Sequence, residues 1–238
     1  MNIILGEFLG TLLLVLLGNG SVANVLLSKS KGEGGGWIVI SAGWGFAAAI
    51  GVYASGWVSG AHLNPAVTVG LIAAGKSTLA ESPLYFFGQM LGAMTGALLV
   101  WLTYLPHWAA TENKNLKLLC FCTQPAIRRY AANILSEMIG TAVLLIGILS
   151  ILDKHNNLGF GLAPFIVGIL IYSIGLSLGG PTGYAINPAR DLGPRIIHSL
   201  LPIAGKGKSD WSYAWIPVVG PIIGALVGAG LYSWIVPI

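Results

Sequence analysis

Charged residues are scarce in this chain of 238 residues, where 8% are Asp, Glu, Lys or Arg against about a quarter in a typical soluble domain. This scarcity excludes an ordinary soluble protein. Cysteine is also rare, because only Cys120 and Cys122 are present. They lie too close together for an easy disulfide and are too few for a zinc site, so we expect two free thiols. The net charge of +4 is scattered over connecting segments, which argues against nucleic acid as a partner.

Apolar residues are abundant instead, at 55% of the chain with a mean hydropathy of +0.80. About 20 apolar residues span the hydrocarbon core of a bilayer as a helix. Six runs have this character and occupy residues 3–27, 37–58, 83–105, 132–152, 160–179 and 214–237. The first run has no basic residue before it and contains Glu7, so we expect a retained span and not a signal peptide. The sequence therefore predicts an all-α membrane protein, a single domain over 1–238 with six transmembrane helices.

Two further segments, 62–75 and 184–200, are too short to span a bilayer. Each opens with the same tripeptide, Asn64, Pro65 and Ala66 in the first and Asn187, Pro188 and Ala189 in the second. Asparagine is a preferred N-cap, and proline is tolerated at the first helical position because its missing N–H would be unpaired there. The first segment corresponds to about 16–18 Å of helix, half of the hydrocarbon core. We therefore predict two re-entrant half-helices.

The two halves of the chain repeat each other. The stretch GEFLGT at 6–11 matches SEMIGT at 136–141, so that Glu7 recurs as Glu137. The repeats cover about 1–105 and 132–238 and are joined by a linking loop at 106–131. Because each repeat has three spans, an odd number, the second must be inverted in the membrane relative to the first. The half-helices then approach each other from opposite faces, and irregular backbone at that depth implies a central pathway.

Two Asn-Pro-Ala motifs in an inverted six-span repeat resemble the aquaporin superfamily over the whole chain. The stretches SGAHLNPAVT and GYAINPARDLGP are most similar to its glycerol facilitator branch, the aquaglyceroporins, in which Asp191 follows Arg190. The resemblance implies the aquaporin fold and a passive channel for glycerol, other small uncharged solutes and water. It also implies no cofactor, no enzymatic activity and a homotetramer in the cell membrane.

The half-helix starts predict the character of such a pore. Each helix N-terminus carries the equivalent of about half a positive charge, so two of them repel cations. The Asn64 and Asn187 oxygens should cap their own helices and turn their NH2 donors toward the pore. The resemblance implies a line of backbone carbonyl acceptors at Gly60, Ala61, His62, Leu63, Gly183, Tyr184, Ala185 and Ile186. Apolar side chains should form the opposite wall.

The resemblance further places a selectivity filter at Trp44, Gly175, Tyr184 and Arg190. Glycine opens the bore, the two aromatic residues form an apolar corner, and Arg190 supplies donors and a fixed charge against cations and protons. Glycerol facilitators usually carry phenylalanine where this chain has Tyr184. The added hydroxyl leaves the ranking of glycerol against water open.

Other polar residues within the spans are expected to support the structure. The resemblance implies that Glu7 and Glu137 accept N–H bonds from the irregular loops, although a proton relay is an alternative. Asp191 and Arg195 are four residues apart and should pair, which fixes the second half-helix. No metal-ligand or nucleophile constellation is present. Glycines at 92, 96, 220, 224 and 228 predict close helix contacts.

Two alternative functions and one conflict stay open. The first alternative is a channel chiefly for water or another neutral solute, such as hydrogen peroxide or protonated lactic acid. The second is an ion-coupled secondary transporter, which shares inverted repeats and broken helices.

The conflict concerns orientation, because the side of the termini holds Lys76 and Lys154, whereas the opposite loops hold eight basic residues, Lys29, Lys31, Lys114, Lys117, Arg128, Arg129, Lys206 and Lys208. The positive-inside rule then places the termini outside, whereas the resemblance, which we follow, places them in the cytoplasm.

Overall fold

Six long helices form the body of the protein in a computed structural model that describes residues 2–159 and 161–236. They are α1 (Ile3–Leu26), α2 (Trp37–Ser59), α4 (Ser82–Thr103), α7 (Tyr130–Ile151), α8 (Leu162–Leu178) and α10 (Ile216–Ile235). They match the six predicted runs, of which residues 160 and 237 lie outside the described residues. Five of them have the length and apolar character of membrane spans, and the sixth, α8, has 17 residues, the lower end of the spanning range of about 17–25.

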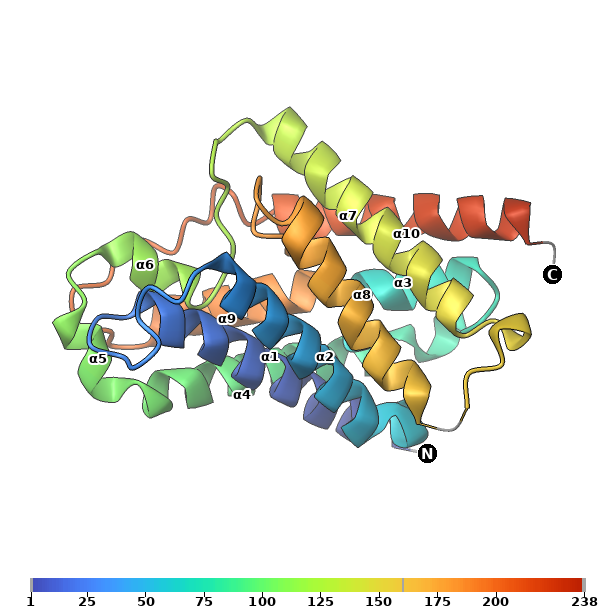
Figure 1. The fold of residues 1–238 in the computed structure, drawn as a ribbon, viewed down its shortest axis with the longest axis horizontal. Coiled ribbons are helices and arrows are strands. Elements are labelled where there is room, and N and C mark those ends of the chain that lie inside the picture. Colours follow the sequence, from blue (N-terminus) through green and yellow to red (C-terminus); the bar gives the residue numbers. More distant parts are fainter. Residues whose placement is uncertain (1, 160, 237–238) are drawn as a thin grey trace.

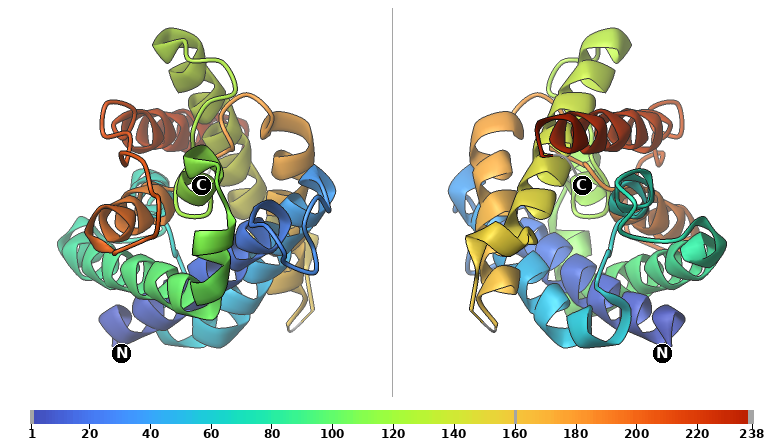
Figure 2. Two further views of the ribbon diagram at one scale, coloured as in Figure 1. Left: turned by 90° about the vertical axis from the view of Figure 1, so that its left-hand side faces the viewer. Right: turned by 90° about the vertical axis from the view of Figure 1, so that its right-hand side faces the viewer.

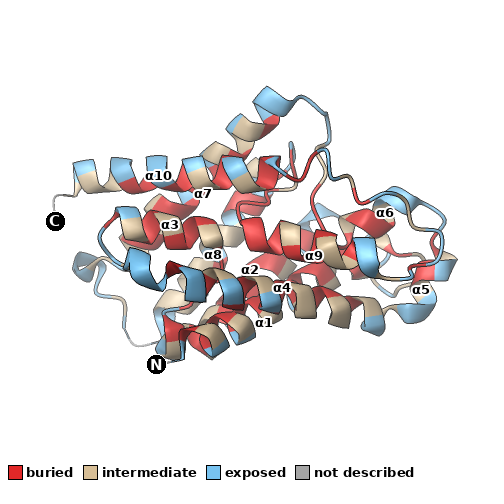
Figure 3. Cartoon of the chain, turned by 180° about the vertical axis from the view of Figure 1, so that it is seen from behind, coloured by how far each residue is buried: buried red, intermediate tan, exposed pale blue. Residues whose placement is uncertain are grey.

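The two predicted half-helices are present as α3 (Pro65–Ala73) and α9 (Pro188–Leu200). Each begins directly after its asparagine, with nine residues in α3 and 13 in α9. Figure 3 shows them end to end in the middle of the molecule, between α10 and α4, and their ends are in contact. The start of α1 and the end of α10 lie at the same end of the molecule in Figure 1, as an even number of crossings requires.

The helices pack as two related groups that exchange their half-helices. Within the first group α1 packs against α2 and α4, and within the second α7 packs against α8 and α10. The groups meet through α2 and α8, while α3 packs against α10 and α9 packs against α4. The end-on views of Figure 2 show the two half-helices on one side of the bundle, between α10 and α4. Each half-helix is therefore held by a span from the other repeat.

Glycines bring the paired spans into backbone contact, as the sequence predicts. A Cβ atom at Gly92 of α4 would lie 2.4 Å from the carbonyl oxygen of Phe8 in α1. At the equivalent place in the other repeat, a Cβ atom at Gly224 of α10 would lie 2.3 Å from the carbonyl oxygen of Met138 in α7. Such distances leave no room for a side chain, so close helix packing requires glycine at both positions.

The linking segment differs from the predicted loop because it contains two short helices, α5 (Leu105–Ala110) and α6 (Lys114–Leu119). Packing of aromatic side chains explains why this segment is folded. Trp108 and Phe121 are buried with ring centroids 5.5 Å apart, and Phe121 also meets the His198 ring of α9. Cys120 and Cys122 are buried here as free thiols. The linker thus covers the end of the second half-helix.

The outer surface of the bundle is apolar. The side chains of Trp57, Trp234 and Ile38 are 82%, 80% and 65% exposed. The buried faces of the helices point toward the interior of the bundle in Figure 3. Large apolar side chains exposed along several spans suit a hydrocarbon surround. The protein is a multi-pass membrane protein.

Candidate functional site

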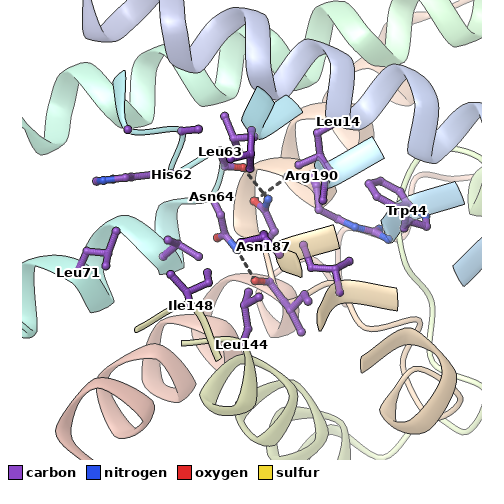
Figure 4. A pocket seen from close by; sticks show the side chains of 18 of the residues that line it. Leu14, Trp44, His62, Leu63, Asn64, Leu71, Leu144, Ile148, Asn187 and Arg190 are labelled. Atoms are coloured by element: carbon purple, nitrogen blue, oxygen red, sulfur yellow. Dashed lines mark hydrogen bonds between the residues drawn. The ribbon is translucent and has the colours of Figure 1, made fainter. Parts of the chain in front are cut away.

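A narrow cavity of about 110 Å³ lies where the two half-helices meet, with room for several waters or one small solute. Figure 4 shows Asn64 and Asn187 at its centre, Arg190 and Trp44 on one side, and His62 and Leu71 on the other. Its polar lining comes from the two re-entrant segments. Its apolar lining comes mainly from four spans, with Val67 and Leu71 of α3 added, and the span residues include Leu14, Val52, Leu144, Ile148, Val167 and Ile171. The cavity therefore has one polar side and one apolar side.

Asn64 and Asn187 cap their own half-helices and also join the two repeats. The Asn64 side-chain oxygen accepts from the Ala66 N–H at 2.8 Å, and its amide nitrogen donates to the Ile186 carbonyl at 2.7 Å. In the mirrored arrangement, Asn187 accepts from the N–H of Ala189 at 3.0 Å and donates to the Leu63 carbonyl at 2.8 Å. From the sequence we expected both N–H groups of each asparagine side chain to point into the pore. The structure uses one to join the halves, which leaves one for a solute.

The segments before the two caps have an unusual backbone. Ala61, Leu63, Tyr184 and Ile186 have φ of 51°, 53°, 38° and 42°, in the left-handed region that favours glycine. Each such non-glycine residue costs on the order of 1–3 kcal/mol and persists only where its surroundings hold it. These residues lie outside helices and line the cavity, so their carbonyls are not consumed by helical hydrogen bonds. Those of Leu63 and Ile186 already accept a bond from an asparagine.

Two buried carboxylates hold this strained backbone in place. Glu7 accepts from the N–H groups of His62 and Leu63 at 3.0 and 2.7 Å. Glu137 accepts from those of Ala185 and Ile186 at 3.0 and 2.7 Å. Neither carboxylate is part of the cavity lining. This geometry is that of a structural support and differs from a relay along the pathway.

Sequence reasoning missed the side chains that complete the site of Glu7. Ser59 donates to Glu7 at 2.6 Å and Gln89 donates to it at 2.8 Å, so this carboxylate accepts four hydrogen bonds in total. Tyr85 adds a bond to the Ser59 carbonyl. A glutamine inside the apolar run at 83–105 was the available signal, because a buried polar side chain needs a partner.

The four predicted filter residues cluster at one end of the cavity. The Arg190 guanidinium carbon lies 4.0 Å from the centroid of the Trp44 ring, a cation–π contact. Arg190, Trp44 and Tyr184 line the cavity, whereas Gly175 does not. Gly175 lies behind the Tyr184 ring, and a Cβ atom there would lie 2.8 Å from the Tyr184 hydroxyl oxygen. That hydroxyl is buried, so Tyr184 presents only its ring to the bore.

Asp191 and Arg195 form a buried ion pair that ties the second half-helix to the loops around it. Two Arg195 nitrogens donate to Asp191 at 2.9 and 2.8 Å. The other Asp191 oxygen accepts from the Thr123 N–H at 2.7 Å, and Arg195 donates to the carbonyls of Ser209 and Asp210. Because all its polar atoms find partners, this pair avoids the cost of an uncompensated buried charge.

This arrangement suits passage of a neutral solute between two faces of a membrane. Two half-helix N-termini and the Arg190 guanidinium make the cavity unfavourable for cations. Donors and acceptors follow one side of it, and apolar side chains follow the other. No cluster of three His, Cys, Asp or Glu side chains that could hold a metal is found among the described residues. Fold and site together define a membrane channel with two re-entrant half-helices.

Comparison with known proteins identifies the family. The Major intrinsic protein family matches residues 1–232, and the chain belongs to it. A Thermotoga maritima protein named "Probable glycerol uptake facilitator protein" is 60% identical over 235 residues, which cover 99% of this chain and 100% of that one. Glycerol uptake facilitator protein 3 of Lactiplantibacillus plantarum is 55% identical, over 97% and 95% of the two chains. The X-ray structure of the aquaglyceroporin from Plasmodium falciparum superposes with a TM-score of 0.89 at 33% identity, over 99% and 96%. These matches confirm the aquaporin fold.

Proposed function

We propose that this protein is a passive channel for glycerol and other small uncharged solutes, with water as a further permeant. One observation carries the proposal: Asn64 and Asn187 meet on a single cavity that is polar along one side and apolar along the other. Glycerol has hydroxyls along one edge and carbons along the other, so it matches both sides. The relatives named as glycerol facilitators support the same solute. Such conduction needs no cofactor, and the family consists of channels and not of enzymes.

In this proposal the predicted filter selects the solute. Arg190 donates to solute hydroxyls and repels cations and protons, while Trp44 and Tyr184 contact the carbons. Gly175 contributes by admitting the Tyr184 ring and not by lining the bore. The carbonyls of 60–63 and 183–186, with the remaining N–H of each asparagine, pass the hydroxyls along. Glu7, Glu137, Asp191 and Arg195 keep this backbone fixed.

The alternatives predict different solutes or a driving ion. A channel chiefly for water would exclude glycerol, and one for hydrogen peroxide or protonated lactic acid would favour those solutes over polyols. A secondary transporter would need a coupling ion site. Glu7 and Glu137, the acids within spans, are both occupied by backbone N–H groups, which disfavours that role.

A permeability series in proteoliposomes tests the solute. Light scattering would follow water, glycerol, larger polyols, urea and lactic acid with the purified chain. We expect glycerol to pass well above protein-free vesicles and larger polyols to pass more slowly. Ile171→Trp, which fills the apolar wall of the cavity, should abolish glycerol flux, whereas Leu226→Trp on the exposed face of α10 should preserve it. Equal flux in both variants would place the pathway elsewhere.

We also propose a homotetramer in which each subunit carries its own pore, on the basis of the family alone. Native mass spectrometry of the purified protein in mild detergent tests it. A tetrameric mass is expected, and a monomeric mass that conducts glycerol would refute it.

For orientation, we propose that both termini are cytoplasmic. The opposing count of basic residues has a structural explanation, because several of them are bound within the protein. Lys206 donates to the carbonyls of His198 and Ser199 at the C-terminal end of α9, at 2.8 and 2.9 Å. Arg128 pairs with Asp210. Protease accessibility of a C-terminal tag in intact cells tests the orientation. The tag should be protected, and cleavage by protease added outside would show that the C-terminus is extracellular.

A further inference from the structure

The Tyr184 ring lies in a socket built from two helices. Gly175 of α8 and Gly179, which directly follows the last residue of α8, are one turn apart, and a Cβ atom at either would meet the Tyr184 ring, at 2.8 and 2.6 Å. On α2, Trp37 and Ser41 are likewise one turn apart. The Trp37 and Tyr184 rings meet edge to face with centroids 5.8 Å apart, and the Trp37 indole donates to the Gly175 carbonyl at 2.8 Å.

Two hydroxyls meet at the deep end of this socket. The position of a Cβ atom at Gly175 lies 2.8 Å from the Tyr184 hydroxyl oxygen and 3.1 Å from the Ser41 Cβ, so the two side chains face each other across that glycine. Both hydroxyl oxygens are buried, and neither forms a hydrogen bond within the described part of the chain. A buried hydroxyl without a partner is costly, so each is the natural partner of the other.

We propose that Ser41 is a specificity-determining residue, which acts by pairing with the Tyr184 hydroxyl and keeping it out of the bore. This proposal rests on the proposed function and names the device that lets a tyrosine serve where glycerol facilitators usually carry phenylalanine. With its hydroxyl held by Ser41, Tyr184 presents an apolar ring beside Trp44. Without Ser41, the phenol seeks a partner among the donors, acceptors and waters of the bore, and the apolar corner becomes narrower and more polar. The ratio of glycerol flux to water flux then falls.

Paired substitutions test this role in proteoliposomes by measuring glycerol and water flux on the same vesicles. Ser41→Ala should lower the glycerol-to-water ratio at least about threefold, because it leaves the phenol without its partner. Tyr184→Phe removes the hydroxyl that Ser41 is proposed to hold, so its own ratio is the reference against which the double variant is read. The double variant should match Tyr184→Phe. Ser55→Ala is the matched control, because Ser55 is equally buried on α2 but bonds to Gly51 of its own helix.

The outcomes separate this proposal from the proposed function. If the unaltered protein conducts glycerol and Ser41→Ala keeps its ratio, the pairing is refuted and the channel is not. The same holds if Ser41→Ala lowers the ratio equally in the Tyr184→Phe background, since a merely structural effect would not depend on the phenol. If Ser41→Ala fails to fold, the double variant should fold again, because it also removes the phenol that lost its partner, and a double variant that stays unfolded overturns the pairing. Absence of glycerol flux in the unaltered protein would refute the proposed function instead.

Discussion

The side-chain amide of Asn187 donates a 2.8 Å hydrogen bond to the carbonyl oxygen of Leu63, in the other repeat of the chain. Asn64 returns the same bond to Ile186. Each asparagine thus completes the site of the opposite repeat while capping its own half-helix. The pathway forms only when both repeats are assembled, so its geometry and the stability of the fold are coupled at these two residues.

Replacing Asn187 with alanine should therefore destabilise the protein more than the loss of an ordinary cap. The cap alone contributes about 1 kcal/mol, and the bond to Leu63 about another 1 kcal/mol. We expect a lower unfolding temperature in detergent and a lower glycerol flux. Asn113→Ala is the control, because Asn113 caps α6 away from the cavity. Equal shifts in the two variants would show that the bond between repeats adds nothing.

Arg190 is expected to exclude protons and cations rather than to stabilise the fold. Arg190→Ala removes the fixed charge beside Trp44, and a barrier lowered by about 1.4 kcal/mol raises a rate about tenfold. Proton leak into vesicles that contain a pH-sensitive dye should rise by on the order of tenfold. Arg190→Lys keeps the charge and should restrict the leak. Unchanged leak in Arg190→Ala would remove Arg190 from the barrier.

Two glycines of α10, Gly224 and Gly230, should differ in how substitution by alanine changes the unfolding temperature. Gly224→Ala places a Cβ atom against the Met138 carbonyl oxygen and should lower the unfolding temperature, because backbone cannot move away cheaply. A Cβ atom at Gly230 meets nothing within 4 Å, so Gly230→Ala should be neutral or stabilising by up to about 1 kcal/mol. An equal change in unfolding temperature in both variants would show that the close contact at Gly224 does not limit stability.

Most of the architecture was predictable, because it depends on local signals. Apolar runs of sufficient length fix the six spans, and the Asn-Pro pairs at Asn64 and Asn187 fix the start of each half-helix. The folding of α5 and α6 was not predictable, since it depends on Trp108 packing on Phe121 and on Phe121 reaching His198 of α9, far away in sequence. Neither was the exchange of half-helices between the repeats.

The structure brings together most residues that the sequence names for the candidate site, but the sequence does not give their geometry. The family resemblance, located by distance from the two motifs, implies Arg190, Trp44 and Tyr184, and these three line one cavity. It does not tell where a side chain points, so Gly175 was expected on the bore and lies behind Tyr184. The left-handed backbone at Leu63 and its counterparts carries no sequence signal, because non-glycine residues occupy it only under the constraint of their neighbours.

The loop between α7 and α8 gives a prediction for pH. Asp153 accepts from the His155 backbone N–H at 2.9 Å, from the Tyr232 hydroxyl at 2.7 Å and from the His155 ring at 2.7 Å, and these bonds lower its pKa to about 2. A lowered pKa means that the stabilisation is present above the ordinary value near 3.8 and is lost as the pH falls toward 2. Tyr232→Phe should raise the pKa of Asp153 but leave it below its ordinary value.

Carbon-13 NMR of aspartate carboxyl groups, with the protein in micelles, measures this shift. Asp210 serves as an internal control at the opposite end of the molecule. Burial alone would raise the pKa of Asp210, and hydrogen bonds from Arg128 and Ser212 bring it below its usual value. It should titrate identically in both proteins, whereas an unmoved Asp153 would show that Tyr232 does not hold the carboxylate.

The most direct test of a passive pathway between Asn64 and Asn187 is glycerol equilibration across proteoliposomes with no ion gradient. Radiolabelled glycerol should reach equal concentrations on both sides, at a rate that ionophores for protons and sodium leave unchanged and that Ile171→Trp abolishes. Accumulation above equilibrium under an ion gradient, or a rate that falls when the gradient is collapsed, would contradict a channel.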